Sequence, residues 1–472
     1  MKHFILFISL VLATGAFAQE SFFQEYFSEN FEEGTDIIKR DDNSYILGGW
    51  SRSYKGEEFQ FLKIVDLAGT EISTKYISSE NASRGHLICQ DYDNMILILR
   101  DSTINDTSYM IISKVNFSGE EIESHAVMPG HGFGIVKDDE QGYYIIGKKD
   151  HQKNTLVVNL DNSFNVTWDQ EYYPSLQNGQ KTTPRSAKIL NNNLYVIGDY
   201  YDSPGYGIDG KSFILCISES GDSLNCLNLD EYYNEAYNSL ITTSDGNLIT
   251  TGNYGLYYYE GNGSILKLTP DLDTIWHNSF YYDYGMYCDD LIETSDGDII
   301  VCGGQFKSNF SSSNFFLKKI NSEGENIWYN QIEIGNSSNG KNLWLPNEES
   351  ILCIGYTSDS NNEYQNNSFL MKTDSEGNLL GINNLTNTQY NIQISPNPAN
   401  DQCTIMINNI HGKTVSISVY NNFGQKVFVE TEEKIHSTIY KKNLNLESLT
   451  PGLYFIQIKI DGQMETKKIV IQ

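Results

Sequence analysis

Residues 292–306 read "IETSDGDIIVCGGQF", a polar turn between two apolar runs. An Asp-Gly pair in this position is a strong hairpin signal, because these residues tolerate the positive φ angles of a tight turn. The acidic core could instead hold a metal ion. It lacks the alternate ligand positions and the glutamate at position twelve of a calcium loop, so we predict a turn and no metal site.

This hairpin recurs along the chain. Aligned on the residue that ends the second apolar run, the copies fall at Gly48, Leu99, Gly147, Gly198, Gly252, Gly303 and Gly355. Successive spacings are 51, 48, 51, 54, 51 and 52 residues. Each copy continues into a second apolar pair, such as "FFLKKINSEGENIW" at 315–328, so each unit holds four short strands, a to d.

Four antiparallel strands in ~50 residues, repeated radially, are the signature of a β-propeller blade. We therefore predict an all-β chain, with a seven-bladed β-propeller over residues 19–390 and a small Ig-like β-sandwich over 391–472. The segment "FFQEYF" at 22–27 resembles the fourth strands of the units. It is expected to pair into the last blade and close the ring, since an open ring leaves unpaired strand edges.

The formal charge of the chain is −29, and the C-terminal segment does not share it. From Asn391 onward there are eight lysines and seven acidic residues, which leaves a net charge of −30 on the remainder. Such a body repels phosphates, so we expect no nucleic-acid partner and at most a peripheral association with the outer membrane.

The first residues, "MKHFILFISLVLATGAFAQ", have the order of a secretory signal peptide. Lys2 and His3 precede an apolar run, and small residues end it. We predict a signal peptide over residues 1–18, cleaved after Ala18. The apolar run is too short for a spanning helix, which needs about 20 residues.

Seven cysteines occur without a Cys-x-x-Cys pair, and most lie inside apolar strand runs. We expect buried free thiols that act as small apolar residues. Cys288 and Cys302 flank one hairpin and are the pair to examine for a bridge.

The periodicity changes after residue 390. Four motifs follow in order: Pro396-Asn397-Pro398, a strand ending at Tyr420 before Phe423-Gly424-Gln425, Leu449-x-Pro451-Gly452-x-Tyr454, and Lys467-Lys468 before a terminal apolar strand. Together they resemble the type A C-terminal sorting domain of type IX secretion cargo. The preceding units resemble the propeller-like repeats of exported proteins of the Bacteroidetes, a resemblance that identifies an architecture rather than an activity.

The sorting-domain resemblance implies export through the signal peptide and then recognition by the type IX machinery of the outer membrane. The cargo would be secreted or held at the outer cell surface. The resemblance also implies removal of the sorting domain by a sortase-like peptidase.

No zincin, nucleophile-elbow, phosphate-loop or dinucleotide motif occurs, and no cofactor is predicted. His131 in "PGHGFG" could be a base or a ligand at the central funnel, but no nucleophile or second ligand lies nearby in the sequence, so we favour an exposed histidine on a glycine-rich loop. Asp289 and Asp290 are the candidates for a carboxylate pair.

The loops between strands b and c and between blades fall on one face of a propeller, and here they are long and rich in tyrosine. From blade 3 onward they hold 18 of the 32 tyrosines. Rigid half-polar rings among Asp and Asn suit binding of sugars or proteins, but they could equally cap blade edges. The predicted binding residues are Tyr200, Tyr201, Tyr232, Tyr233, Tyr254, Tyr257, Tyr258, Tyr281, Tyr282 and Tyr284.

Three functions remain open at this stage. We favour a binding module for a glycan or a protein. The alternatives are a propeller-type glycoside hydrolase or lyase that uses Asp289 or Asp290, and a structural surface protein.

The sorting domain gives a first prediction. The protein recovered from the medium or the cell surface should lack the segment that begins near residue 391, and intact mass spectrometry measures this directly. A secreted form that still ends at Gln472 would contradict processing.

Overall fold

The chain was analysed in a computed structural model that describes residues 21–28, 30–78, 88–90, 95–138, 142–149, 154–174, 181–201, 210–229, 236–254, 261–280, 284–307, 312–358, 366–379, 392–408, 413–421, 426–429, 433–435, 439–446, 449–460 and 463–471. Within these ranges the chain forms strands and turns without a helix, so it contains no apolar helix long enough to cross a bilayer. The chain divides into two compact units, residues 1–385 and 386–472.

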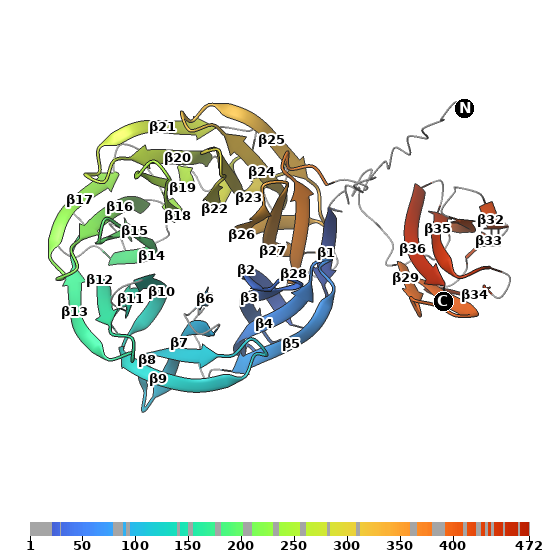
Figure 1. The fold of residues 1–472 in the computed structure, drawn as a ribbon, viewed down its shortest axis with the longest axis horizontal. Helices are drawn as coiled ribbons and strands as arrows, with labels where there is room; N and C mark the ends of the chain where they lie inside the picture. The colour runs from blue at the N-terminus through green and yellow to red at the C-terminus, as the bar shows by residue number, and fades with distance from the viewer. Residues whose placement is uncertain are drawn as a thin grey trace, which may run out of the picture. The chain divides into compact units, whose positions relative to one another are not determined.

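The first unit consists of seven four-stranded antiparallel sheets placed around a ring, which confirms the predicted propeller (Figure 1). The strands of the first three blades in chain order are β2 (Phe31–Asp41), β3 (Ser44–Arg52), β4 (Glu58–Asp66), β5 (Glu71–Ser78), β6 (Ile88–Gln90), β7 (Ile96–Ile104), β8 (Thr107–Val115), β9 (Glu121–Pro129), β10 (His131–Asp138), β11 (Gly142–Lys148), β12 (Thr155–Leu160) and β13 (Val166–Tyr172).

The next three blades are followed by a last blade that takes one strand from the other end of the chain. Their strands are β14 (Lys181–Leu190), β15 (Asn193–Tyr201), β16 (Gly210–Ile217), β17 (Ser223–Leu229), β18 (Ala236–Thr242), β19 (Leu248–Tyr254), β20 (Asn262–Leu268), β21 (Thr274–Phe280), β22 (Met286–Glu293), β23 (Ile299–Phe306), β24 (Ser313–Ile320), β25 (Asn326–Ile332), β26 (Ser337–Asn347), β27 (Ser350–Ser358), β28 (Asn366–Asp374) and β1 (Phe22–Tyr26).

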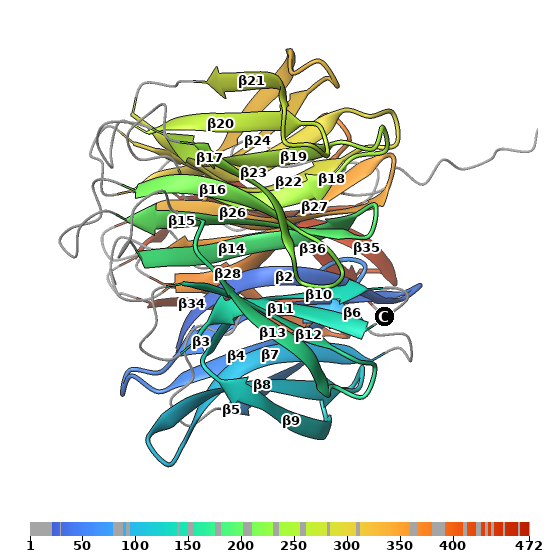
Figure 2. The same cartoon turned by 90° about the vertical axis from the view of Figure 1, so that its left-hand side faces the viewer.

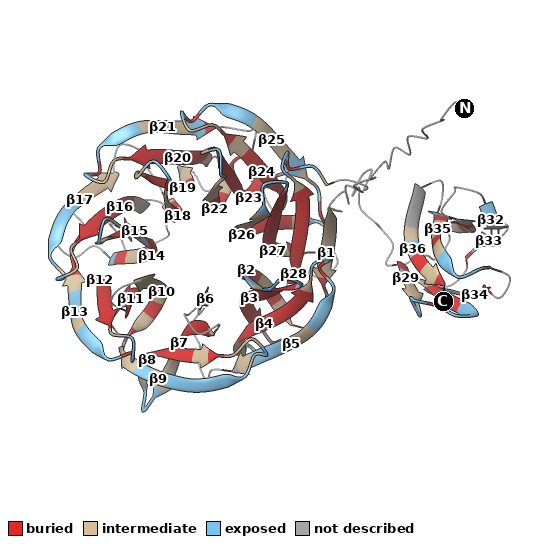
Figure 3. Cartoon of the chain, viewed as in Figure 1, coloured by how far each residue is buried: buried red, intermediate tan, exposed pale blue. Residues whose placement is uncertain are grey.

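The apolar runs of the sequence form the two middle strands of each blade. β23, with the sequence "IIVCGGQF", is buried at every position, while the outer strand β25 of the same blade is mostly exposed or half-buried (Figure 3). A strand that is covered on both faces needs a continuous apolar run rather than alternation. Neighbouring blades supply that cover as they stack side by side (Figure 2).

The tetrapeptide Ser295 to Asp298 is the turn between β22 and β23. Thr294 N donates to Asp298 O at 2.8 Å, and Gly297 N donates to Thr294 O at 3.0 Å. Of the Asp-Gly pair only Gly297 takes a positive φ, +85°. A side chain at this position would be strained, which explains the glycine.

Tryptophans of the outer strands connect consecutive blades. Trp168 Nε1 donates to Glu219 O, and Trp276 Nε1 donates to Ser322 O, both at 3.1 Å. In each case the indole ring lies on a turn glycine of the next blade. At Gly324 an added Cβ would lie 3.1 Å from the Trp276 ring, so glycine permits the close approach.

The ring closes through β1. This strand pairs antiparallel with β28, from Phe22 opposite Lys372 to Tyr26 opposite Ser368. Tyr26 is 3% exposed, and its hydroxyl donates to Gly69 O of blade 1 at 2.7 Å. β1 therefore completes the last blade and also contacts the first.

The second unit contains a three-stranded and a five-stranded sheet around a single apolar core. The strands are β29 (Ile392–Ser395), β30 (Gln402–Asn408), β31 (Thr414–Asn421), β32 (Lys426–Val429), β33 (Glu433–Lys434), β34 (Ile439–Asn445), β35 (Gly452–Ile460) and β36 (Gln463–Ile471). Ile405 of one sheet and Ile417 and Ile456 of the other share this core, as in a small β-sandwich.

Cys288 and Cys302 are both free and buried. They lie on paired strands, but Cys288 is opposite Gly303, and Cys302 is opposite Asp290. Their side chains pack into different apolar clusters, one on each face of the sheet. A bridge between them would have to cross the sheet.

The closing strand gives the second prediction. Tyr26→Ala should lower the free energy of unfolding of the propeller by about 3–5 kcal/mol, because a large buried ring and its hydrogen bond are lost. Phe27→Ala, which truncates the 68%-exposed next residue, should change it by less than ~0.5 kcal/mol. Chemical unfolding of both variants, together with a deletion of residues 21–28, measures this. Equal stability of the deletion and the parent chain would show that β1 does not hold the ring closed.

Candidate functional site

A cavity of about 1150 Å³ lies at the centre of the propeller. Most of its lining comes from the innermost strands β2, β10, β14, β18, β22 and β26 (Figure 1). It also includes Asn191 and Asn192 of the β14–β15 turn and Glu219 of the β16–β17 turn. The cavity therefore reaches the face that carries the short turns.

Each of these six inner strands has one extra residue at an equivalent position, relative to the strand that it pairs with; β2 and β26 have a second register shift next to the turn that follows them. The register shifts at the same place in every case, as between Cys288 and Asp290 of β22. The extra residues are Thr35, Phe133, Arg185, Asn238, Asp289 and Lys341. A β-bulge of this kind turns side chains away from the regular alternation, and all but Phe133 line the cavity.

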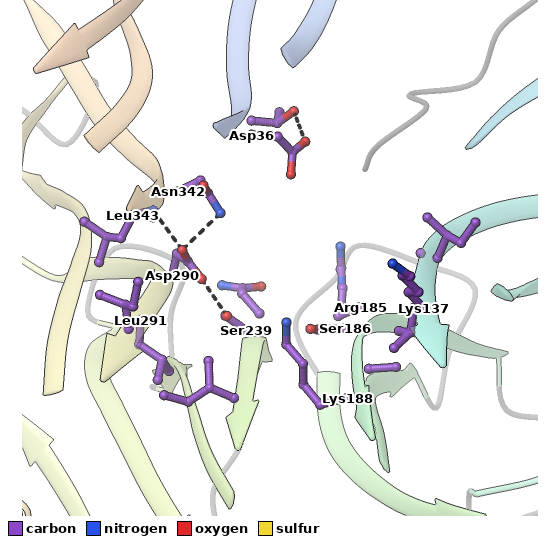
Figure 4. Close-up of a pocket in the computed structure, with 18 of the residues that line it drawn as sticks. Asp36, Lys137, Arg185, Ser186, Lys188, Ser239, Asp290, Leu291, Asn342 and Leu343 are labelled. Atoms are coloured by element: carbon purple, nitrogen blue, oxygen red, sulfur yellow. Dashed lines mark hydrogen bonds between the residues drawn. The ribbon is translucent and has the colours of Figure 1, made fainter. Parts of the chain in front are cut away.

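Asp290 joins three blades at the cavity wall (Figure 4). Its carboxylate accepts hydrogen bonds from Ser239 Oγ at 2.7 Å, Asn342 Nδ2 at 3.2 Å and Leu343 N at 2.9 Å. Burial raises the pKa of Asp290 above its ordinary value, and these donors only partly offset that effect.

Asp289, the neighbouring bulge residue, forms an ion pair with the bulge residue of the next blade. Lys341 Nζ donates to Asp289 Oδ1 at 2.7 Å, and Asn339 Nδ2 donates to Oδ2 at 2.8 Å. Burial alone would lower the pKa of Lys341, but the charge of Asp289 outweighs it and holds the pKa above its usual range. The carboxylate and the ammonium therefore compensate each other.

Cationic side chains enter the cavity from β10 and β14. Figure 4 shows Arg185 and Lys188 extending from β14, with Lys137 beside them on β10. Arg185 Nε donates to Oδ2 of the buried Asp199 at 2.7 Å, which orients the guanidinium, and the side chain remains 40% exposed. Lys188 is exposed, and its charge is one of the effects that oppose the rise in the pKa of Asp290.

Lys148 of β11 lies behind this group. Its Nζ donates to Thr183 Oγ1 at 2.6 Å, and the ammonium lies 5.6 Å from the centre of the Phe133 ring. Burial, together with the charges of Arg185 and Lys181, lowers the pKa of Lys148 to about 8. The two positive charges that act on Lys148, those of Arg185 and Lys181, both belong to β14.

The tyrosines predicted to bind lie for the most part outside the described residues: Tyr232, Tyr233, Tyr257, Tyr258, Tyr281 and Tyr282. Tyr201 and Tyr254 end strands β15 and β19, but their side chains are not described. Tyr200 is 2% exposed and packs in the apolar cluster between two blades. Tyr284 is 38% exposed.

His131 has a partner that the local sequence did not show. Its Nδ1 lies 2.8 Å from Oδ2 of Asp101, a buried residue of the preceding blade, whose Oδ1 accepts from Gly132 N. The two residues are 30 positions apart and meet only because blades 2 and 3 stack. Among the described residues no group of three or more His, Cys, Asp or Glu side chains could hold a metal ion.

The sorting-motif residues gather at the last strand of the second unit. Asn397 Nδ2 donates to Lys468 O, and Val470 N donates to Asn397 Oδ1, both at 3.0 Å. The Tyr454 hydroxyl donates to Thr450 O at 2.8 Å. Pro396 and Pro398 flank this asparagine, and Lys467 lies on β36 beside Lys468. Gly424 and Ala18 lie outside the described residues.

Residues 393–472 match the family described as the secretion system C-terminal sorting domain. A search of curated proteins finds no match.

Several solved structures are similar to this chain. The β-propeller domain of the Trilobed protease from Pyrococcus furiosus aligns with 76% of this chain and 100% of its own at 11% identity and a TM-score of 0.43. The Dos1 propeller aligns with 81% of this chain and 92% of its own at 12% identity and a TM-score of 0.44. An acylaminoacyl peptidase from Pyrococcus horikoshii aligns with 80% of this chain and 58% of its own, at 13% identity and a TM-score of 0.42.

The strand order defines a β-propeller followed by a small β domain. The C-terminal domain is a type IX sorting tail. It implies interaction with the type IX secretion machinery and supports secretion or surface export of the chain.

The buried lysine gives the third prediction. Between the folded-state pKa of Lys148, about 8, and the ordinary lysine pKa of 10.5, the unfolded chain binds more protons than the folded one. Stability relative to Lys148→Met should therefore rise as the pH rises through this window. Urea unfolding of both chains at several pH values from 7 to 10.5 measures the difference. A constant difference would place the Lys148 pKa at its ordinary value.

Proposed function

We propose that the protein is a type IX cargo whose propeller binds an external glycan or protein without catalysing a reaction, and that the central cavity is its principal site. The observation that carries this proposal is the cavity of about 1150 Å³, lined by polar side chains from the inner strands of six blades. Pockets of this size, with a few convergent polar groups, are the usual binding sites of proteins.

The hydrogen bonds of Asp289 and Asp290 favour binding over hydrolysis. A glycosidase needs one carboxyl group to donate a proton and a second to act as base or nucleophile. Asp289 is held by Lys341 and Asn339, and Asp290 already accepts three hydrogen bonds. Both groups hold neighbouring blades together. The raised pKa of Asp290 is the one feature that a general acid would share, so hydrolysis is the second candidate.

The tyrosine-rich loops remain a proposed second contact surface on the opposite face. Tyr284 is the exposed member of this set whose side chain is described. Amphipathic rings at the rim of a ring-shaped scaffold could extend contacts with a long ligand.

The fourth prediction tests binding at the cavity. The fluorescently labelled full chain should bind members of a glycan and peptide array, and Ser186→Trp should abolish that binding because the indole projects into the cavity and obstructs ligand contacts beside Arg185 and Lys188. Ser163→Trp, an equal change on an exposed turn outside the cavity lining, should leave it intact.

Other results would redirect the assignment. If Ser186→Trp retains binding and Tyr257→Ala with Tyr258→Ala removes it, the site lies in the loops. Release of reducing ends from polysaccharides, abolished by Asp290→Asn, would establish hydrolysis. Absence of binding by the parent chain would favour a structural surface role.

A further inference from the structure

The six bulges of the inner strands repeat in position but not in chemistry. The same register shift places a hydroxyl, an aromatic ring, a guanidinium, an amide, a carboxylate and an ammonium at equivalent points of successive blades. Positions that build the blade keep one kind of residue, such as the glycine that ends most of the apolar runs. The bulge position keeps its backbone geometry and changes its side chain in each of the six blades.

The positions with a repeated residue type build the scaffold, and the positions with a variable side chain are the candidates for ligand specificity. The bulge breaks the regular ladder in each of these six inner strands, and bulges that recur next to a cavity serve to aim side chains into it. Since five of the six extra residues line the cavity, the ring of bulge residues is where this chain encodes what the cavity accepts.

The charged side chains of the lining differ in how far they are already paired within the protein. Six acidic and four basic side chains line the cavity, so the sum alone disfavours an anion. The acidic bulge of blade 6 is, however, already satisfied: Asp289 is paired with Lys341 at 2.7 Å, and Asp290 accepts three hydrogen bonds from neighbouring blades. These carboxylates have little capacity left for a ligand cation.

The opposite part of the ring presents cations. Arg185 is oriented by Asp199 and remains exposed. Lys188 is also exposed and lies three residues further along the same strand. Lys137 of β10 lines the cavity beside them. A ligand group in direct contact with Arg185 and Lys188 is bound mainly by these two charges, because the Coulomb energy falls with distance, although Lys188 also acts on Asp290.

Hydroxyl and amide groups complete the lining of the cavity. Thr35, Ser186, Asn238, Ser239 and Asn342 line the cavity, and Asp36, across from β14 in Figure 4, accepts from the Thr35 hydroxyl at 2.8 Å. Trp344 contributes an aromatic side chain to the wall. Neutral donors and acceptors with an aromatic ring fit a ligand that carries many hydroxyls.

The geometry points to an acidic carbohydrate as the ligand, with a sugar carboxylate bound by Arg185 and Lys188 and its hydroxyls bound by the amide and hydroxyl side chains of the other bulges. This assignment rests on the proposed binding function and names the ligand class for it. A carboxylate matches the fork of a guanidinium, which binds it through two parallel hydrogen bonds. The bulge ring thereby discriminates charged from neutral sugars.

The fifth prediction uses isothermal titration of the full chain with trigalacturonate and with its neutral methyl ester. The acid should bind about tenfold or more tightly than the ester, because the hydrogen bonds to charged groups are lost in the ester. Lys188→Gln should weaken binding of the acid about tenfold and leave the ester unchanged. Lys55→Gln, which removes an exposed charge from the β3–β4 loop, should alter neither.

Inorganic phosphate, inorganic sulfate and hexaglutamate are titrated in parallel to identify the source of the charge. Tighter binding of any of these than of trigalacturonate would overturn the carbohydrate assignment. Equal affinity for acid and ester, an unchanged affinity of Lys188→Gln, or no binding of the acid would overturn it as well. If neutral array glycans bind and Ser186→Trp abolishes that binding, the cavity remains the binding site and only the anionic specificity fails.

Discussion

A four-stranded blade has two apolar faces and can bury neither by itself, so every blade depends on both neighbours. β23 is buried along its whole length only because blades 5 and 7 cover its two sides. Trp168 and Trp276 fix the spacing by lying on turn glycines of the next blade. A ring satisfies this requirement for all blades at once, provided that the last meets the first, and β1 completes that contact through Tyr26.

Ring closure brings the inner strands together and determines what the centre can hold. Seven equivalent strands would give a symmetric channel, but side chains at the bulges remove the symmetry. Between blades 6 and 7 the bulge residues pair with each other, as Asp289 does with Lys341. At blade 4 Arg185 is supported from behind by Asp199 and directed inward. The same β-bulge thus places an ion pair between blades 6 and 7 and an exposed guanidinium, that of Arg185, at blade 4.

The sequence predicted the blades well because continuous apolar runs and Asp-Gly turns are local signals, and their regular spacing counts the units. The sorting domain was also predictable from its motifs, since Asn397 and Tyr454 make their hydrogen bonds within one small sandwich. The bulges could not be predicted. A bulge is a property of the pairing between two strands, so the extra residue can be identified only when both paired strands are known. The contact between Asp101 and His131 was also not predicted, because the two residues meet only through the stacking of blades 2 and 3.

The choice of face illustrates what composition can miss. Tyrosines drew attention to the long loops, whereas the cavity lining extends to Asn191 and Glu219 of the short turns. Short turns carry few residues and so contribute little to any compositional signal, yet in a propeller they surround one mouth of the central cavity. A search for specificity in a repeat protein is therefore better directed at positions where the backbone repeats and the side chain does not. In this chain those positions are the bulges, and their chemistry changes from one blade to the next.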